Sequence, residues 1–266
     1  MEIIGYICAL IIGLSLGLIG GGGSILTVPV MVYLFGISPV LATAYSLFIV
    51  GVSALFGAYK NIQSGLINYR VAIVFAIPSF ITVFLTRLYL VPWIPDVIYS
   101  TETFVVTKSL GIMVLFALVM LLAAWSMIRS GKTTTKELTN EINLNIPVII
   151  LEGVLVGIVT GLVGAGGGFL IIPVLVLFVG LSMKQAVGTS LLIITVKSLI
   201  GFTGDLGASQ NIDWMFLLSF STLAVVGILL GVYLSKYISG KKLKAGFGWF
   251  VLIMAIYILT KELLMS

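Results

Sequence analysis

The sequence GGGGS at residues 20–24 interrupts an apolar segment that runs from Ile3 to Phe35. A related sequence, GAGGG at residues 164–168, interrupts a second apolar segment, residues 146–179. A helix does not continue easily through several glycines, because each one loses more backbone entropy than alanine would. In a lipid bilayer the freed amides and carbonyls find no water, so a break is stable only inside protein or beside a polar cavity. One such break could be a packing turn, but two matched breaks indicate a binding site.

The composition is that of an integral membrane protein. Of the 266 residues, 60% are hydrophobic and 9% are charged, which lies far outside the range of soluble domains. The net charge of +5 requires no nucleic-acid partner, because the basic residues lie in short loops, where they orient the chain in the membrane. Cys8 is the single cysteine and there is no histidine, so we expect no internal disulfide, no His/Cys metal site and no cofactor. The expected surroundings are membrane lipid.

Apolar runs separated by polar residues predict an all-α fold of ten helical elements. The expected ranges are 3–19, 24–36, 40–60, 69–91, 107–129, 146–163, 168–180, 184–204, 213–238 and 243–264. A helix needs about 20 residues to cross about 30 Å of hydrocarbon. The second and seventh elements are shorter than this, and each follows a glycine break and contains a proline. They are therefore predicted to be half-length or tilted helices.

The second half of the chain repeats the first. With an offset of 144 residues and no gap, residues 17–57 align with 161–201, and 18 of the 41 positions are identical. One residue of slippage then aligns the sequence INY, which begins at Ile67, with IDW, which begins at Ile212. We therefore expect two transmembrane repeats, residues 1–129 and 146–266, joined by a cytoplasmic linker at 130–145.

The charges of the loops predict that the two repeats are inverted. Lys60 and Arg70 bracket the loop between the third and fourth elements, which places this loop inside by the positive-inside rule. The corresponding 204–213 loop carries two aspartates and no base, so it is expected outside. Basic residues place the 130–145 linker and the 236–244 connection inside. These assignments agree if each repeat crosses five times, which inverts the second repeat and puts both termini outside. Inverted repeats are typical of secondary transporters.

The helices that follow the two breaks predict an anion-binding site. The N-terminus of a helix presents free backbone amides and the positive end of the helix dipole. If the elements at 24–36 and 168–180 enter from opposite sides and their N-termini meet, these amides form a cradle for an anion. Ser24 could add a hydroxyl donor, and glycine allows an anion to approach the backbone closely.

Two ionisable residues lie well inside the predicted spans. Lys197 is about two helical turns from either end of its apolar stretch, and a charge there is costly enough to be a functional candidate. We expect it to be a counter-charge for the anion or a proton carrier. The alternative is a structural ion pair with Glu152, which is also a possible coupling residue. Arg87, Lys108 and Lys261 lie near helix ends and are expected to extend to the membrane interface.

Small and polar residues line one face of the third element and one face of the eighth. Ser46 and Ser190 belong to these two faces, as do the aligned pair Ser53 and Lys197. Membrane helices also use small residues for close packing, so packing is the simpler explanation for the alanines and glycines of these faces. It does not explain Lys197.

The paired glycine runs, each leading into a proline and then into an Ala-x-x-x-Ser-Leu helix, resemble the sulfite exporter TauE/SafE family, also described as the 4-toluene sulfonate uptake permease group. The resemblance covers nearly the whole chain. It implies a plasma-membrane transporter of sulfur-containing or related organic anions, such as sulfite, sulfoacetate or other sulfonates. It also implies a substrate-binding zone at the two breaks and at the helices that carry the two serines. The expected residues are Gly20, Gly21, Gly22, Gly23, Ser24, Ser46, Gly164, Ala165, Gly166, Gly167, Gly168 and Ser190, and the physical argument above adds Lys197.

These observations predict a secondary transporter that moves a small anion by alternating access. A coupled proton, if there is one, would be carried by Glu152, Lys197 or the substrate. No Walker-type motif is present, so direct ATP hydrolysis is not expected. An anion channel of the same architecture is the alternative within transport. A membrane enzyme is less favoured, because the chain has no histidine and few carboxylates in its spans. The sequence leaves open which anion is carried, in which direction, with which coupling ion and in which oligomeric state.

Overall fold

The protein is built almost entirely from helices, as the sequence predicts. The computed structural model describes residues 2–100, 105–129, 146–164, 166–177, 179–206, 212–235, 237 and 240–264. The helices are α1 (Glu2–Ile19), α2 (Ser24–Tyr33), α3 (Pro39–Gln63), α4 (Tyr69–Leu85), the π-helical turn η1 (Thr86–Leu90), α5 (Val91–Trp93), α6 (Lys108–Arg129), α7 (Ile146–Val163), α8 (Gly168–Leu177), α9 (Met183–Leu206), α10 (Trp214–Leu234) and α11 (Gly240–Leu264). Because α4, η1 and α5 are continuous, each of the ten predicted elements is present. The linker predicted at 130–145 lies outside the described residues.

Two local features were not predicted. The fourth element contains five residues of π-helix, Thr86–Leu90, and it continues to Trp93. A π-helical turn is wider than an α-helical one, which changes the direction of the side chains that follow. After this element, β1 (Val97–Ser100) and β2 (Val105–Thr107) pair as a short antiparallel hairpin. Strands of four and three residues are too short for an alternating pattern to separate them from a loop.

The described residues include five helices that are long and apolar enough to cross a membrane. These are Pro39–Gln63, Tyr69–Trp93, Ile146–Val163, Met183–Leu206 and Trp214–Leu234. The described parts of α1, α2 and α6 form shorter apolar helices. Large apolar side chains are exposed on the outer faces, among them Ile73 on α4, Leu122 on α6 and Leu151 on α7. Such a surface is suited to contact with lipid. The prediction of an all-α, multi-pass membrane protein is confirmed.

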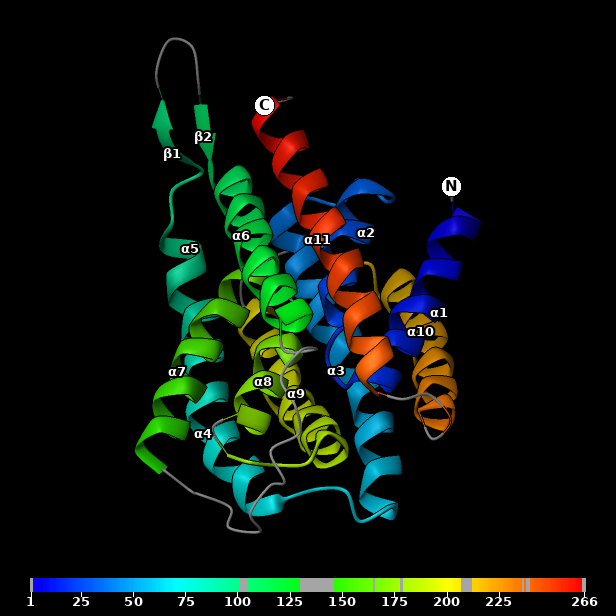
Figure 1. The fold of residues 1–266 in the computed structure, drawn as a ribbon. Helices are drawn as coiled ribbons and strands as arrows, with labels where there is room; N and C mark the ends of the chain where they lie inside the picture. Colours follow the sequence, from blue (N-terminus) through cyan, green and yellow to red (C-terminus); the bar gives the residue numbers. More distant parts are fainter. Residues whose placement is uncertain are drawn as a thin grey trace.

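The two halves of the chain interlock. α1 packs along α10, and α7 packs along α4, so the first helix of each half lies on the fourth helix of the other half (Figure 1). α3 packs against α9, and α6 packs against α11. The pair α3 and α9 forms the centre of the protein. In each of these two helices 67% of an apolar stretch of 18 residues is buried, compared with 39% in α7 and in α10.

The chain runs in opposite directions in the two halves. In Figure 1, α1 descends from the N-terminus, whereas α7 ascends from the lower end of the molecule. Likewise α6 descends, whereas α11 ascends to the C-terminus, so that both termini lie at the upper end. Inverted five-element repeats require these directions. The assignment of the halves as inverted repeats, their boundaries and the side of the membrane that the termini face stay predictions.

Polar contacts between the halves occur in matched pairs. Asn68 and Asp213, which the repeat aligns, are the N-caps of α4 and α10, and each accepts the backbone N–H three residues further on, at 3.1 and 3.0 Å. The backbone N–H of Asn68 donates to Oγ1 of Thr189 at 3.0 Å. The backbone N–H of Asp213 donates to the hydroxyl of Tyr45 at 2.7 Å. Tyr45 and Thr189 are also aligned by the repeat, so the duplication extends to the contacts between the halves.

Candidate functional site

The two glycine breaks meet in the interior of the protein. The backbones of Gly21 and Gly168 are so close that a β-carbon built on either residue would overlap the other. Gly166 lies beside Ser24, with 3.3 Å between a β-carbon built on the glycine and that of the serine. The described residues of both runs are buried. The meeting of the breaks, which the anion cradle requires, is therefore present. Ala165 lies outside the described residues.

Each break begins with a glycine in the left-handed region. Gly20 has φ of +77° and Gly164 has φ of +72°, a conformation that other residues rarely adopt. These two aligned glycines also make matched contacts with the central helices, because Gly20 packs on Val187 of α9 and Gly164 packs on Thr43 of α3. A side chain at either position would push α3 or α9 away from the break.

At the first break the backbone carbonyls accept hydrogen bonds, whereas several backbone N–H groups have no partner among the described residues. The carbonyl of Gly20 accepts the hydroxyl of Ser190 at 2.8 Å, and the carbonyl of Gly21 accepts the hydroxyl of Ser24 at 2.7 Å. The next two carbonyls accept backbone N–H groups from the first turn of α2, at 3.4 and 3.1 Å. Within the described part of the chain, the N–H groups of residues 21–23 have no hydrogen-bond partner. This end of α2 is therefore a buried group of unfilled donors at the positive end of a helix dipole.

Lys197 is fully buried, and its ammonium group lies at the second break. Its Nζ donates to Oγ1 of Thr160 at 3.2 Å. A β-carbon built on Gly167 would lie 2.6 Å from this Nζ, so the absence of a side chain there leaves room for the ammonium group. Across the described residues no ion pair joins Lys197 to Glu152, whose Oε2 is buried without a hydrogen-bond partner. The structural ion pair proposed as the alternative role of Lys197 is not formed here.

The two aligned serines of the central helices differ in what they contact. Ser190 lies between two acceptors, the carbonyl of Gly20 at 2.8 Å and that of Val187 at 2.9 Å. Ser46 is also fully buried, but its hydroxyl has no hydrogen-bond partner among the residues that the structure describes. Ser190 therefore holds the first break in its shape, whereas Ser46 has an unused polar group in the interior.

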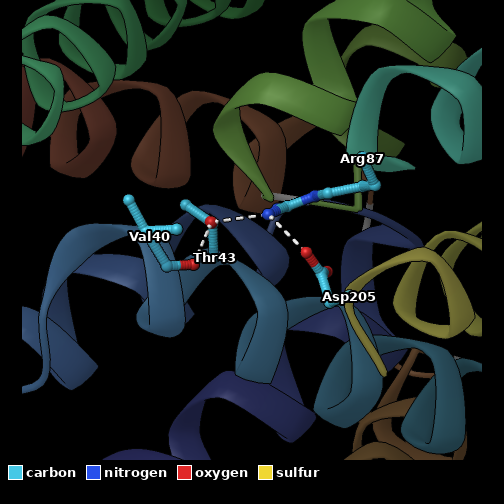
Figure 2. A network of polar contacts seen from close by, with 4 residues as sticks. All are labelled: Val40, Thr43, Arg87 and Asp205. Carbon is cyan, nitrogen blue, oxygen red and sulfur yellow. Dashed lines mark hydrogen bonds and ion pairs between the residues drawn. The ribbon is translucent and has the colours of Figure 1, made fainter. Parts of the chain in front are cut away.

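The prediction that Arg87 extends to the membrane interface is wrong. The side chain is fully buried, and its Nη1 donates to Oγ1 of Thr43 at 2.9 Å and lies 3.5 Å from Oδ1 of Asp205 (Figure 2). Asp205, expected in an outer loop, belongs instead to the last turn of α9. Distance from the end of an apolar run suggested exposure for both residues. Arg87 does lie near the end of the fourth element, but η1 packs on α7 and α9, and the arginine side chain is turned into the protein.

Two polar residues of this region were not predicted from the sequence. Thr160 holds the ammonium group of Lys197, and Thr43 holds the guanidinium group of Arg87. A threonine in a span usually bonds to its own helix, so it gives little signal alone. The repeat contains the missing signal, because the aligned residues are the apolar Leu16 and Val187.

These features define a class of protein. The chain is a multi-pass helical membrane protein whose interlocking halves enclose two helix breaks, and such breaks are found in membrane transporters. The chain belongs to the sulfite exporter TauE/SafE family, whose sequence model matches residues 5–258.

Relatives of the chain are named as probable membrane transporter proteins. One from Xylella fastidiosa is 28% identical over 256 residues, which are 95% of this chain and 92% of that protein. One from Methanocaldococcus jannaschii is 33% identical over 123 residues, 44% of this chain and 46% of that protein. The protein YdhB of Bacillus subtilis is 24% identical over 228 residues, 84% of each chain. No solved structure matches the chain. The family and these names indicate a membrane transporter and not an enzyme.

Proposed function

We propose that the protein is a secondary transporter that carries a small sulfur-containing or organic anion, such as sulfite, sulfoacetate or another sulfonate, across the plasma membrane. The observation on which the proposal rests is the imbalance of the first break, where the carbonyls have partners and three N–H groups have none among the residues that the structure describes. An anion site needs free donors, whereas a cation site needs free carbonyls or carboxylates. Lys197 adds a formal positive charge at the second break.

The proposed binding site combines both breaks. The N–H groups of residues 21–23 lie on one side, held by the hydroxyl of Ser24 on the carbonyl of Gly21, and residues 164 and 166–168 with the ammonium group of Lys197 lie on the other. Lys197 has three donors, and one of them is used by Thr160. Ser46 supplies a further hydroxyl without a partner. Glu152 or Lys197 would carry a coupled proton.

The burial of the site supports alternating access. Ser24, Ser46, Ser190 and Lys197 are all completely buried, so this conformation is closed around the site. A carrier passes through such a closed state in each cycle, whereas a conducting channel needs a continuous path. We propose that rearrangement between the interlocked halves opens the site to each side in turn.

Ligand stabilisation of the purified protein tests the substrate class. The five anions to compare are sulfite, sulfate, thiosulfate, sulfoacetate and taurine, against sodium chloride at equal ionic strength. A ligand present at 100 times its Kd stabilises the folded state by about 2.7 kcal/mol. We expect at least one of the five to raise the melting temperature when chloride does not. If none of them does so, the proposal is contradicted.

Counterflow in proteoliposomes then separates a carrier from a channel. Unlabelled anion inside the vesicles should accelerate uptake of the same labelled anion. A carrier that binds the internal anion returns to the outward-facing state with its site occupied, which exchanges one anion for another. Uptake that does not respond to internal anion would favour the channel.

The proposed orientation, with both termini outside, has its own test. A cysteine introduced at Thr134 in the linker, on a Cys8→Ala background, should resist membrane-impermeant labelling in intact cells and react after permeabilisation. Labelling in intact cells would contradict the proposed topology, in which the linker lies inside and both termini lie outside.

A further inference from the structure

Arg87 is a buried cation whose hydrogen-bonding capacity is largely unused. Its side chain has no exposed surface, yet Nε and Nη2 have no partner among the described residues. A guanidinium group has five N–H donors in a fixed planar fork, and only Nη1 makes contacts here. Unfilled charged donors in an interior are strongly unfavourable, so this group calls for an explanation.

Asp205 does not fill the fork. A carboxylate that matches a guanidinium group makes two parallel bonds of about 2.7–2.9 Å. Within the described ranges, Asp205 makes a single contact with the guanidinium, 3.5 Å through Oδ1, and its buried Oδ2 has no hydrogen-bond partner. Figure 2 shows the carboxylate and Thr43 both approaching the tip of the arginine. The pair neutralises the charge but leaves two edge donors of the guanidinium free.

Arg87 lies one side chain away from the second glycine break. Thr43, which accepts the hydrogen bond from Nη1, is the residue on which Gly164 packs. Along α9, Lys197 and Asp205 are separated by eight residues, about 12 Å at helical rise. One buried cation therefore lies at the break, and a second lies towards the end of α9.

The fold does not require an ion pair at this place. The repeat aligns Asp205 with Asn61 and Arg87 with Val232, so the equivalent position of the other half has no charge. Asn61 is satisfied there by the carbonyl of Gly57 at 2.9 Å. Since packing is achieved without charges in one half, the charges in the other half serve another purpose.

We propose that Arg87 is a second binding position for the transported anion, between the glycine breaks and the end of α9, and that Asp205 is the counter-charge of the guanidinium group when no anion is bound. This inference rests on the proposed function as an anion transporter. The oxygens of a sulfite or sulfonate group match the free Nε and Nη2 edge of the guanidinium in a bidentate way, which an ammonium group cannot offer. The arriving anion binds this free edge and competes with the carboxylate of Asp205 for the charge of the guanidinium, so the contact at Nη1 weakens while the anion is bound and is restored when it leaves. The guanidinium group thus always has a counter-charge.

Two variants of the full-length protein test this. Asp205→Asn removes the competing carboxylate and keeps the side-chain shape. Arg87→Gln with Asp205→Asn removes both charges of the pair, so neither of these two positions keeps an unpaired charge. The measurement is the apparent Kd for sulfite and for sulfoacetate, from thermal stabilisation at constant ionic strength. Asn61→Ser, at the aligned position of the other half, is the matched control.

We expect Asp205→Asn to bind at least one of the two anions about tenfold more tightly, because the anion no longer competes with a tethered carboxylate. The double variant should lose this gain, and Asn61→Ser should bind like wild type. Unchanged or weaker binding by Asp205→Asn would overturn the proposal, as would a gain that persists in the double variant.

If Asp205→Asn does not fold, the neutral double variant decides. Sulfite transport in proteoliposomes should then fall about tenfold or more relative to wild type, because the anion loses a binding position. Transport at the wild-type rate would overturn the role of Arg87. A wild-type protein that none of the five anions stabilises would instead contradict the proposed function itself. The two failures are therefore distinguishable.

Discussion

The contact between α1 and α10 and the contact between α7 and α4 are the same contact made twice, with different chemistry. In the first, Gly17 of α1 and Gly231 of α10 bring two backbones together, with 3.0 Å between a β-carbon built on Gly231 and the Cα of Gly17. In the second, Gly161 of α7 packs on the side chain of Thr86, the residue that the repeat aligns with Gly231. Glycine against glycine brings two backbones together, whereas glycine against threonine admits the β-carbon and methyl group of a polar residue into the same space.

The same difference extends to charge. We call α1, α3 and α10 the apolar side, and α4 with η1, α7 and α9 the charged side. Four charged residues that lie in or near the candidate site are on the charged side. They are Arg87, Glu152, Lys197 and Asp205, and their aligned residues on the apolar side are Val232, Cys8, Ser53 and Asn61. One set of packing rules therefore builds both sides, and a few substitutions give one side the chemistry of a site.

The largest expected effect comes from filling the contact between the two breaks. Gly21→Leu places a side chain where the backbone of Gly168 lies. Gly166→Leu places one where the side chain of Val50, from the other half, lies. Each should reduce transport at least about a hundredfold, since small displacements of binding groups have effects of that size. Radiolabelled uptake, corrected for the amount inserted in the membrane, measures this.

Gly36→Ala is the matched control for these variants. Gly36 is also left-handed, with φ of +66°, but nothing lies within 4 Å of a β-carbon built there. It should keep transport near the wild-type level. If both leucine variants transported normally, the breaks would be packing turns and the proposed site would be wrong.

The next largest effect is expected on anion binding, when aligned residues of the two sides are substituted in turn. Lys197→Met should weaken anion binding by about 30-fold or more, the cost of removing a buried hydrogen-bonded charge from a complex. Ser53→Ala, at the aligned position, should change binding little, because its hydroxyl bonds to Ile49 of its own helix at 2.7 Å. Lys197→Arg should recover binding only in part. The measurement is the apparent Kd for sulfite from thermal stabilisation.

The melting temperature separates the two roles of Lys197. Since no ion pair with Glu152 is formed, Lys197→Met should not lower the melting temperature, and removing a buried charge could raise it. A lower melting temperature, with transport restored by adding Glu152→Gln, would show that the lysine serves as a structural partner of the carboxylate.

Much of this architecture could be predicted because the signals are repeated along the chain. Two glycine runs, each before a proline-containing apolar helix, locate the breaks, and the burial of Lys197 follows from its place in the middle of a span. Arg87 could not be placed in the same way. Its distance from the end of the element says nothing about the direction of the side chain, which here turns towards Thr43 and Asp205. Strands of four and three residues, and the partner hydroxyls of Thr43 and Thr160, have no local signal.

A smaller effect is expected from a substitution that makes the α1–α10 contact resemble the α7–α4 contact. Gly227→Thr introduces into α10 the residue that α4 has at the aligned position, Thr82. A β-carbon there would overlap the carbonyl of Leu10 and lie 2.9 Å from the amide of Leu14, so α1 must move. Overpacking of this kind costs about 1–3 kcal/mol, which a lower melting temperature would report. Thr82→Gly removes contacts without overlap and should cost less. Equal melting temperatures for both variants and wild type would mean that the two contacts are interchangeable.

The smallest effect concerns the two helix caps, where the halves are most alike. Asn68→Ala and Asp213→Ala each remove one side-chain hydrogen bond to the first turn of α4 or α10, and each should cost about 1 kcal/mol. The backbone bonds to Thr189 and Tyr45 do not depend on these side chains and should remain. Asp213 also places a negative charge at the positive end of a helix dipole, which is worth about 0.3–1 kcal/mol at an exposed site. Asp213→Ala should therefore destabilise slightly more than Asn68→Ala, and Asp213→Asn should remove only this difference. Melting temperatures of the three variants at low salt measure it, and a difference that persists at high salt would rule out the dipole as its cause.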